Sequence, residues 1–270
     1  MSDKVIPPYL QPIRRMRVAA PPQGLRIAVI PDGQVHEGVP INHWTWVGKY
    51  LATKKPDVIV NLGDFTDFPS ISSYNARGSL QLEGARYKKD VDSSKRAMGL
   101  FVNEISKVPG WNPEMYLTLG NHEHRVIRLI EDDPKLEGII SLDDLKYEDA
   151  GWKVFPFLQP IVVGGIAFCH YFPSGIMGRP ITTARALLSK LHMSVFAGHQ
   201  QVRDIAYGKR ADGVEMTAII SGSFYQHAEE YLSPFTNNHW RGMYLLHEAN
   251  NGSFNEMALS ISYFQRRFGK

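Results

Sequence analysis

Acidic, amide and imidazole side chains recur along this chain directly after short apolar runs. Five such runs end in them: Asp32-Gly33-Gln34, Gly63-Asp64 with Asp67 nearby, Gly120-Asn121-His122-Glu123, His170, and Gly198-His199-Gln200-Gln201. These are the donor groups that proteins use to bind divalent metal ions and to move protons. Burying so many polar groups together is costly unless they bind something. The set therefore predicts a metal-centred site.

Each of these residues also has an ordinary structural explanation. A Gly-Asp pair is usually a turn, and Asn121 could begin a helix whose first turn contains Glu123. His170 alone would more often be a hydrogen-bonded core residue, and His199 alone cannot distinguish a metal ligand from a buried histidine. The repeated placement at run ends favours a common site over these separate explanations.

The apolar runs have the length and the Val, Ile, Leu and Phe content of buried strands. They cover residues 25–33, 57–64, 115–122, 161–172, 193–199, 216–224, 242–249 and 257–264. Helical stretches occur at 42–55, 88–107, 123–133 and 181–192. Because strand and helix alternate in the first half, we expect parallel strands joined by crossover helices. The carboxyl ends of these strands would meet at one edge of the sheet.

From about Val154 onward strands dominate, which predicts a second sheet packed on the first with helices outside. The predicted fold class is therefore α/β, a four-layer α/β/β/α sandwich of two mixed sheets flanked by helices. We expect residues 1–24 to form an extended arm, either flexible or packed on a partner, and residues 25–270 to form a single domain. The polar, irregular segment at about 69–92 is a candidate lid or substrate loop.

Composition describes an ordinary globular protein. Hydrophobic residues make up 43% and charged residues 21%, and the net charge of +3 permits a phosphate-bearing partner without requiring one. A single cysteine, Cys169, excludes a disulfide within the chain and suits a reducing compartment. No run is long enough for a membrane span. We therefore expect a cytoplasmic protein with no membrane partner, and the oligomeric state is left open.

The ordered series resembles the calcineurin-like metallophosphoesterases. The resemblance rests on D-x-Q at 32–34, GD-x-x-D at 63–67, GNHE at 120–123, His170 and GH at 198–199, and it runs from about Leu25 to beyond His199. The segments IPDGQVHEGVP, GNHEHR and NHWRGMYLL are most similar to the branch encoded in bacteriophages and prophages. That branch would place the protein in the cytoplasm of a bacterial host.

The resemblance implies two divalent metal ions bridged by Asp64. One ion would be held in addition by Asn121, His170 and His199, and the other by Asp32, Gln34 and Gln201. A metal-bound water or hydroxide would attack phosphorus. His122 would act as general acid for the leaving group or would stabilise the phosphoryl oxygens, and Asp67 would orient His122.

Gln34 and Gln201 depart from the family pattern, in which most members have histidine at both positions. Imidazole suits zinc and iron, whereas amide and carboxylate oxygens suit manganese and magnesium. We therefore expect the Asp32/Gln34/Gln201 site to be the weaker one, with Mn²⁺ the preferred ion ahead of Mg²⁺, Zn²⁺, Fe or Ni²⁺. His36, two residues beyond Gln34, fits an exposed loop histidine better than a replacement metal ligand. If it contributes to the site, a substrate contact suits it better than metal binding.

The substrate class is a phosphate ester, and mild basicity favours a phosphodiester, either nucleic acid or nucleotide. The alternatives are a phosphomonoesterase acting on proteins or small molecules, and a non-catalytic binding module that retains the fold. Arg125, Arg179 and His227 are the candidate substrate-binding residues, because arginine pairs bidentately with phosphate and His227 follows a strand near the His199 strand. Weaker candidates are Arg77, Arg86, Lys88 and Lys89 for phosphate, and Tyr74, Tyr87, Phe172 and Tyr225 for stacking on a base.

Overall fold

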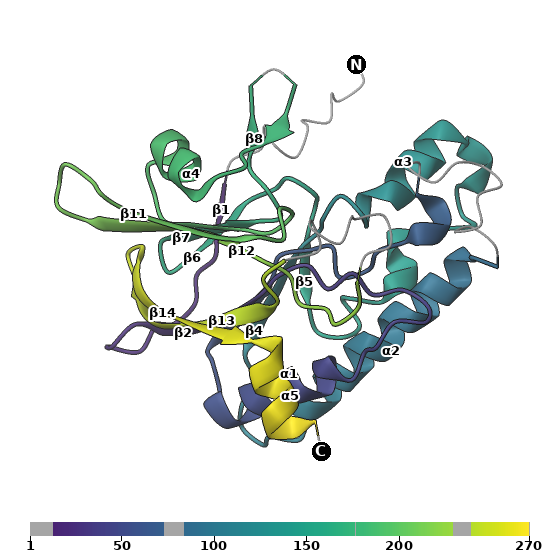
Figure 1. Ribbon diagram of the computed structural model, residues 1–270, viewed down its shortest axis with the longest axis horizontal. Coiled ribbons are helices and arrows are strands. Elements are labelled where there is room, and N and C mark those ends of the chain that lie inside the picture. The colour runs from purple at the N-terminus through teal and green to yellow at the C-terminus, as the bar shows by residue number, and fades with distance from the viewer. Residues whose placement is uncertain (1–12, 73–83, 176, 229–238, 270) are drawn as a thin grey trace.

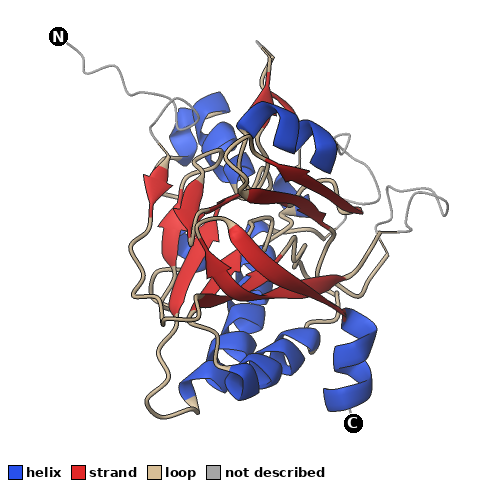
Figure 2. Ribbon diagram, turned by 90° about the vertical axis from the view of Figure 1, so that its left-hand side faces the viewer, coloured by secondary structure: helices blue, strands red, loops and turns tan. Residues whose placement is uncertain are grey.

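The computed structural model describes residues 13–72, 84–175, 177–228 and 239–269. Two sheets lie face to face, with helices against their outer faces (Figure 1). The view turned by 90° shows the same layers from the side (Figure 2). No helix in these described ranges is long and apolar enough to span a membrane.

The first six-stranded sheet has the order β14-β13-β2-β3-β4-β5. Its strands are β2 (Leu25–Ile30), β3 (Val58–Asn61), β4 (Glu114–Thr118), β5 (Lys153–Phe155), β13 (Gly242–Asn250) and β14 (Ser253–Ser260). Strands β2 to β5 are parallel neighbours, and β13 runs antiparallel to β2. The helices α1 (His43–Lys54), α2 (Tyr87–Ser106) and α5 (Ile261–Phe268) cover its outer face (Figure 1).

The second six-stranded sheet has the order β1-β6-β7-β10-β12-β11. Its strands are β1 (Arg14–Arg15), β6 (Ile161–Val163), β7 (Ile166–Cys169), β10 (Val195–Ala197), β11 (Arg203–Lys209) and β12 (Glu215–Ser221). Strand β10 is parallel to both β7 and β12. Helix α4 (Ala184–Leu191) lies on its outer face, and the short hairpin β8 (Pro173–Ser174) and β9 (Arg179–Pro180) stands beyond it (Figure 1).

Three hydrophobic cores separate the four layers, and strand periodicity assigns residues to them. Within β2, Ile27 and Val29 belong to the core between the sheets, whereas Ala28 and Ile30 belong to the core beneath α1 and α2. The third core joins the second sheet to α4 through residues such as Leu187. The predicted α/β/β/α sandwich is confirmed.

The structure corrects two of the element predictions. The run 257–264 was expected to be one strand, but β14 ends at Ser260, whose hydroxyl accepts a hydrogen bond from the Tyr263 backbone N–H and begins α5. The second correction concerns the candidate loop at about 69–92. Pro69–Ile71 is a 3-10 helix and α2 already begins at Tyr87, while residues 73–83 lie outside the described part of the chain.

The described part of the N-terminal arm packs on its own domain. Arg14 and Arg15 pair in parallel with β6, and the Met16 N–H donates to the Val162 carbonyl at 2.8 Å. Met16 and Val18 contact the core between the sheets. The remaining elements are α3 (His124–Asp132) and the 3-10 helices Pro134–Leu136 and Leu142–Leu145.

Candidate active site

The candidate residues follow parallel strands of both sheets. Asp32, Asp64 and Asn121 lie two or three residues after the ends of β2, β3 and β4 in the first sheet. His170 and His199 follow β7 and β10 in the second sheet. The site is therefore built where the carboxyl ends of two sets of parallel strands meet, which is the edge that binds ligands in open α/β sheets.

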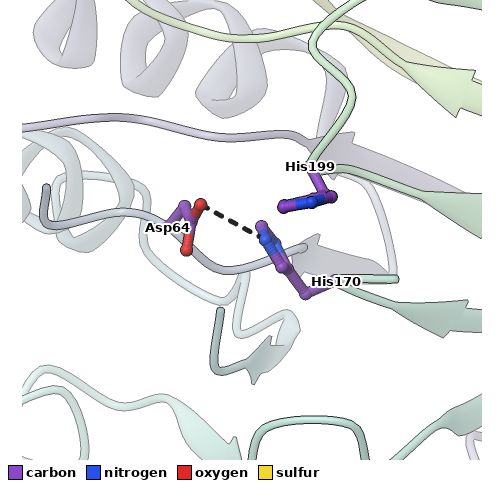
Figure 3. Close-up of side chains that lie close together, drawn as sticks. All are labelled: Asp64, His170 and His199. Atoms are coloured by element: carbon purple, nitrogen blue, oxygen red, sulfur yellow. Dashed lines mark ion pairs between the residues drawn. The ribbon is translucent and has the colours of Figure 1, made fainter. Parts of the chain in front are cut away.

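Asp64, His170 and His199 form the centre of this site (Figure 3). One carboxylate oxygen of Asp64 and one ring nitrogen of each histidine all lie within 4.8 Å of one another. His170 Nε2 is 3.2 Å from Asp64 Oδ2, and the two imidazole rings are 5.2 Å apart between centroids. Asp64 and His170 are buried and His199 is half-buried.

Asn121 and Asp32 complete the surroundings of that centre. Asn121 Oδ1 lies 2.9 Å from His170 Nε2, which is itself 3.2 Å from Asp64 Oδ2. The three donor atoms are therefore close together. The opposite ring nitrogen of His170 is 2.8 Å from the Leu62 carbonyl, which fixes the ring. The backbone N–H of His199 donates to both carboxylate oxygens of Asp32 at 3.1 Å.

The two glutamines make different contacts. Gln34 is fully buried; its Nε2 lies 3.4 Å from Asp64 Oδ2, and its Oε1 accepts no hydrogen bond from the described residues. Exchanging the amide oxygen and nitrogen by a half rotation would bring Oε1 toward Asp64. Gln201 Oε1 instead accepts a hydrogen bond from the Tyr225 hydroxyl at 2.6 Å. Gln34 therefore faces the Asp64 carboxylate directly, whereas Gln201 is oriented by a tyrosine.

Unusual backbone conformations concentrate in these loops. Gln34, Asp64, His199 and Gln201 all have left-handed backbones, with φ of 46°, 47°, 67° and 55°. Such conformations are costly for residues other than glycine and persist where the surrounding structure imposes them, often at functional sites. Here the four strained residues are candidate metal ligands, so the strained backbone orients side chains of the site.

The adjacent glycines are required mainly for space. A Cβ atom on Gly120 would lie 2.0 Å from Asp64 Oδ1, and one on Gly198 would lie 2.4 Å from Asp32 Oδ1. Gly63 has a positive φ, at 86°, whereas Gly120 and Gly198 do not. The glycines therefore have two roles: Gly63 lets the chain turn sharply, whereas Gly120 and Gly198 leave room for a carboxylate against the backbone.

Burial and close charges shift the pKa values of the buried site residues. Burial raises the pKa of Asp32 to about 7. Burial also acts to raise the pKa of Asp64, but His122 and His170 outweigh it and hold that pKa below its usual range. For His170 burial acts to lower the pKa, yet Asp64 and then Asp32 raise it to about 9. Burial lowers the pKa of His199 to about 4.

This arrangement fits a divalent cation. Asp32 and Asp64 are two buried carboxylates close together, and a divalent cation between the donor groups would balance their charge. The atoms that face the centre are carboxylate and amide oxygens and imidazole nitrogens, all of them metal donors. The buried Gln34 oxygen, which accepts no hydrogen bond from the described residues, could serve as a further donor if the amide turned it toward Asp64.

His122, Asp67 and Arg125 form an interlocked group next to the centre. His122 Nδ1 is 2.6 Å from Asp67 Oδ1, and Nε2 lies 3.6 Å from Asp64 Oδ2. Arg125 donates to the Asp67 carbonyl at 2.7 Å and places Nη2 3.1 Å from His122 Nε2. Burial opposes a charge on His122, but Asp64 and Asp67 raise its pKa above the ordinary value.

Glu123 is a site residue that the sequence reasoning assigned only to a helix turn. Its carboxylate is fully buried and accepts hydrogen bonds from the backbone N–H groups of Asp64 (2.9 Å), Thr66 (3.1 Å) and Gly120 (2.9 Å). It thereby holds the loop after β3 against the loop after β4. The signal was present in the sequence, because Glu123 completes the GNHE segment.

The candidate substrate residues lie in different places. Arg125 belongs to the interlocked group, whereas Arg179 is exposed on the β8–β9 hairpin and has no part in the contacts of that group among the described residues. His227 is half-buried, and its ring stacks on Tyr225 at 4.5 Å.

Most of the weaker candidates are engaged within the fold. Tyr225 and Phe172 are buried, and Tyr87 stacks on Phe68 at 5.5 Å, so these rings are core residues rather than stacking surfaces. Arg86 precedes α2 and Lys89 pairs with Glu37 at 2.9 Å. Lys88 is exposed on α2, and Arg77 and Tyr74 lie outside the described residues.

Comparison with known proteins identifies the family. Residues 25–222 match the calcineurin-like phosphoesterases, which is more than half of the chain. No curated protein is similar enough to the chain to match it. A crystal structure of a dimetal phosphatase from Danio rerio aligns at 11% identity over 87% of this chain and 99% of that chain, with a TM-score of 0.40. A second solved structure aligns at 9% identity over 87% and 99%, with a TM-score of 0.43.

The family assignment rests on the match of residues 25–222. The matched residues include Asp32, Asp64, the GNHE segment, His170 and His199. The chain therefore belongs to the calcineurin-like phosphoesterase family and is a metal-dependent phosphoester hydrolase.

Proposed function

We propose that the protein hydrolyses phosphodiesters at the Asp64 centre, with His122 as general acid. The observation that carries this proposal is the position of His122 Nε2, 3.6 Å from Asp64 Oδ2 while Nδ1 is held by Asp67 at 2.6 Å. A divalent ion bound at Asp64 would supply Lewis-acid activation of water and would neutralise phosphoryl charge.

The histidine and its neighbours supply the remaining chemistry. The Asp67 contact keeps a proton on His122 Nδ1, and in this geometry Nε2 accepts a hydrogen bond from Arg125 Nη2. To act as general acid, Nε2 would have to take up a proton in place of that contact and pass it to the leaving oxygen. Asp64 and Asp67 raise the His122 pKa, which favours the protonated form that a general acid needs. Arg125, fixed by the Asp67 carbonyl, keeps a positive charge beside Nε2 where phosphoryl oxygens would lie. A non-catalytic module would have no use for this group.

Charge favours a diester over a monoester. A phosphate monoester carries close to two negative charges at neutral pH and a diester carries one, so a monoesterase needs more cationic partners. Arg125, the arginine that contacts His122, already donates to the carbonyls of Asp67 and Phe68, and its side chain is only 12% exposed. That limited positive charge suits a monoanion. The runner-up is a phosphomonoesterase.

We further propose Asp64, Asn121, His170 and His199 as ligands of the tighter ion, and Asp32, Gln34 and Gln201 as ligands of a weaker one. The second set offers only oxygens, which favours Mn²⁺ or Mg²⁺ over Zn²⁺. The contact between Gln34 and Asp64 supports Gln34 as a ligand of the weaker ion. The Gln201 oxygen would have to bind the ion while it also accepts the hydrogen bond from Tyr225. Origin in a bacteriophage or prophage stays a prediction from the similarity of short sequence segments.

Hydrolysis of bis-p-nitrophenyl phosphate and p-nitrophenyl phosphate by metal-stripped protein tests the substrate class and the metal together. We expect Mn²⁺ to restore the highest activity, Mg²⁺ less and Zn²⁺ least, with kcat/KM at least about tenfold higher for the diester. That difference corresponds to about 1.4 kcal/mol of transition-state stabilisation. A higher kcat/KM for the monoester would replace the diesterase proposal with the runner-up. Maximal activity with Zn²⁺ would contradict the oxygen-donor argument.

A further inference from the structure

A row of aromatic rings extends outward from Gln201. The Tyr225 hydroxyl holds Gln201 Oε1 at 2.6 Å, and the Tyr225 ring stacks on His227 at 4.5 Å with an interplanar angle of 27°. His227 in turn meets His36 at 5.3 Å in an edge-to-face arrangement of 81°. Tyr225 is buried, whereas His227 and His36 are half-buried. The row therefore leads from the site toward the surface.

The inner end of the row is fixed. The Arg241 guanidinium lies 4.8 Å from the Tyr225 ring centroid, and Arg241 Nη1 donates to the Gln226 carbonyl at 3.2 Å. The Tyr225 hydroxyl also lies 3.0 Å from His239 Nδ1. A flat group that binds the outer rings would meet a surface that is already ordered, which lowers the entropic cost of binding.

The outer end of the row lies beside the proposed general acid. The Asp67 N–H donates to the Val35 carbonyl at 3.0 Å, and Val35 forms a bridge with Thr66, so residues 35–36 run alongside residues 66–67. His36 therefore lies on the segment next to Asp67, the residue whose carboxylate holds His122.

We propose that His36 and His227 form a binding site for the flat heterocycle of the substrate, so that the natural substrates are phosphodiesters that carry a nucleobase. Stacking on aromatic side chains tolerates every base, because each base presents a π-face. Because residues 35–36 run beside residues 66–67, a base held there would lie next to the group of His122, Asp67 and Arg125. The inference rests on the proposed function and extends it to a substrate class.

Two diesters that release the same leaving group test this site. Thymidine 5′-(4-nitrophenyl phosphate) and methyl 4-nitrophenyl phosphate both yield 4-nitrophenolate, and they differ in whether the retained arm carries a base. We expect wild-type kcat/KM to favour the thymidine ester by roughly fivefold to a hundredfold, the range of one base–aromatic stack. His36→Leu and His227→Leu should reduce that ratio toward one, while His36→Phe should preserve it by keeping a ring.

His192→Asn is the control, because His192 is an exposed histidine in a left-handed backbone (φ 52°) that asparagine tolerates. It should leave the ratio unchanged. A wild-type ratio near one, an unchanged ratio in both leucine variants, or an equal loss in His36→Phe would overturn the ring site.

Calorimetric binding of thymidine monophosphate and methyl phosphate to the Mn²⁺-loaded protein separates the two proposals. Tighter binding of thymidine monophosphate that is lost in His36→Leu would keep the ring site even if neither ester were hydrolysed, and only the proposed function would then fail. Equal binding of the two ligands would overturn the ring site.

Discussion

Replacing His122 with alanine is expected to lower kcat by roughly 10²- to 10⁴-fold, the usual contribution of a positioned general acid. The metal centre should survive, because the bond from His122 to Asp64 Oδ1 comes from the backbone N–H and is kept in alanine. Steady-state kinetics with saturating Mn²⁺, together with a metal-binding titration, measures both effects. A kcat within a few-fold of wild type would contradict the assignment of the acid.

The leaving group distinguishes the two roles open to His122. A general acid matters most when the leaving group is a poor one, so the loss in His122→Ala should be larger for alkyl esters than for 4-nitrophenyl esters. Stabilisation of phosphoryl oxygens would give similar losses for both. His124→Ala is the matched control: the ring lies two residues further on, packs against Phe157 at 4.9 Å, and should change kcat little.

Replacing Glu123 with glutamine is expected to weaken Mn²⁺ binding by about 10- to 100-fold, the usual cost of removing a group that orients metal ligands. The amide has one acceptor oxygen where the carboxylate has two, so its NH₂ group would face a backbone N–H of Asp64, Thr66 or Gly120. One unsatisfied buried donor also costs about 1–3 kcal/mol of folding stability. Calorimetric metal titration and thermal unfolding measure the two effects.

Glu131→Gln provides the comparison for that experiment. Glu131 is exposed on α3, so the same chemical change there should alter neither metal affinity nor the unfolding temperature. If Glu123→Gln bound Mn²⁺ like wild type, the two loops would be held in place by other contacts, and the positioning role of Glu123 would be wrong.

The layers of the fold follow from local sequence patterns. Apolar runs of strand length alternate with helical stretches as far as β4, and this alternation is enough to predict parallel strands and the edge at which Asp32, Asp64 and Asn121 gather. The second sheet was predicted from the strand-rich second half. Because each strand end was recognisable, His170 and His199 could be expected at the same edge although more than 100 residues separate them from Asp64.

Features that depend on distant contacts could not be predicted. Strand β11 is polar and partly exposed, so it has no apolar run, and its strand conformation comes from antiparallel pairing with β12. The start of α5 depends on a single serine cap inside an apolar segment. The Tyr225 hydroxyl donates a hydrogen bond to Gln201, and the backbone N–H groups of Asp64 and Thr66 donate to Glu123. These bonds join segments that are separated in the chain, so residue type alone does not predict them.

The most direct test of the Asp64 centre is a calorimetric titration of Mn²⁺ into metal-stripped wild-type protein and into Asp64→Asn. Asparagine tolerates the left-handed backbone at this position (φ 47°), so the substitution removes the charge with little backbone strain. We expect the wild type to bind Mn²⁺ with release of protons. Asp64→Asn should bind at least about 100-fold more weakly, as expected when a charged ligand is lost from a buried site. Equal Mn²⁺ affinity in the two proteins would contradict an ion held at Asp64.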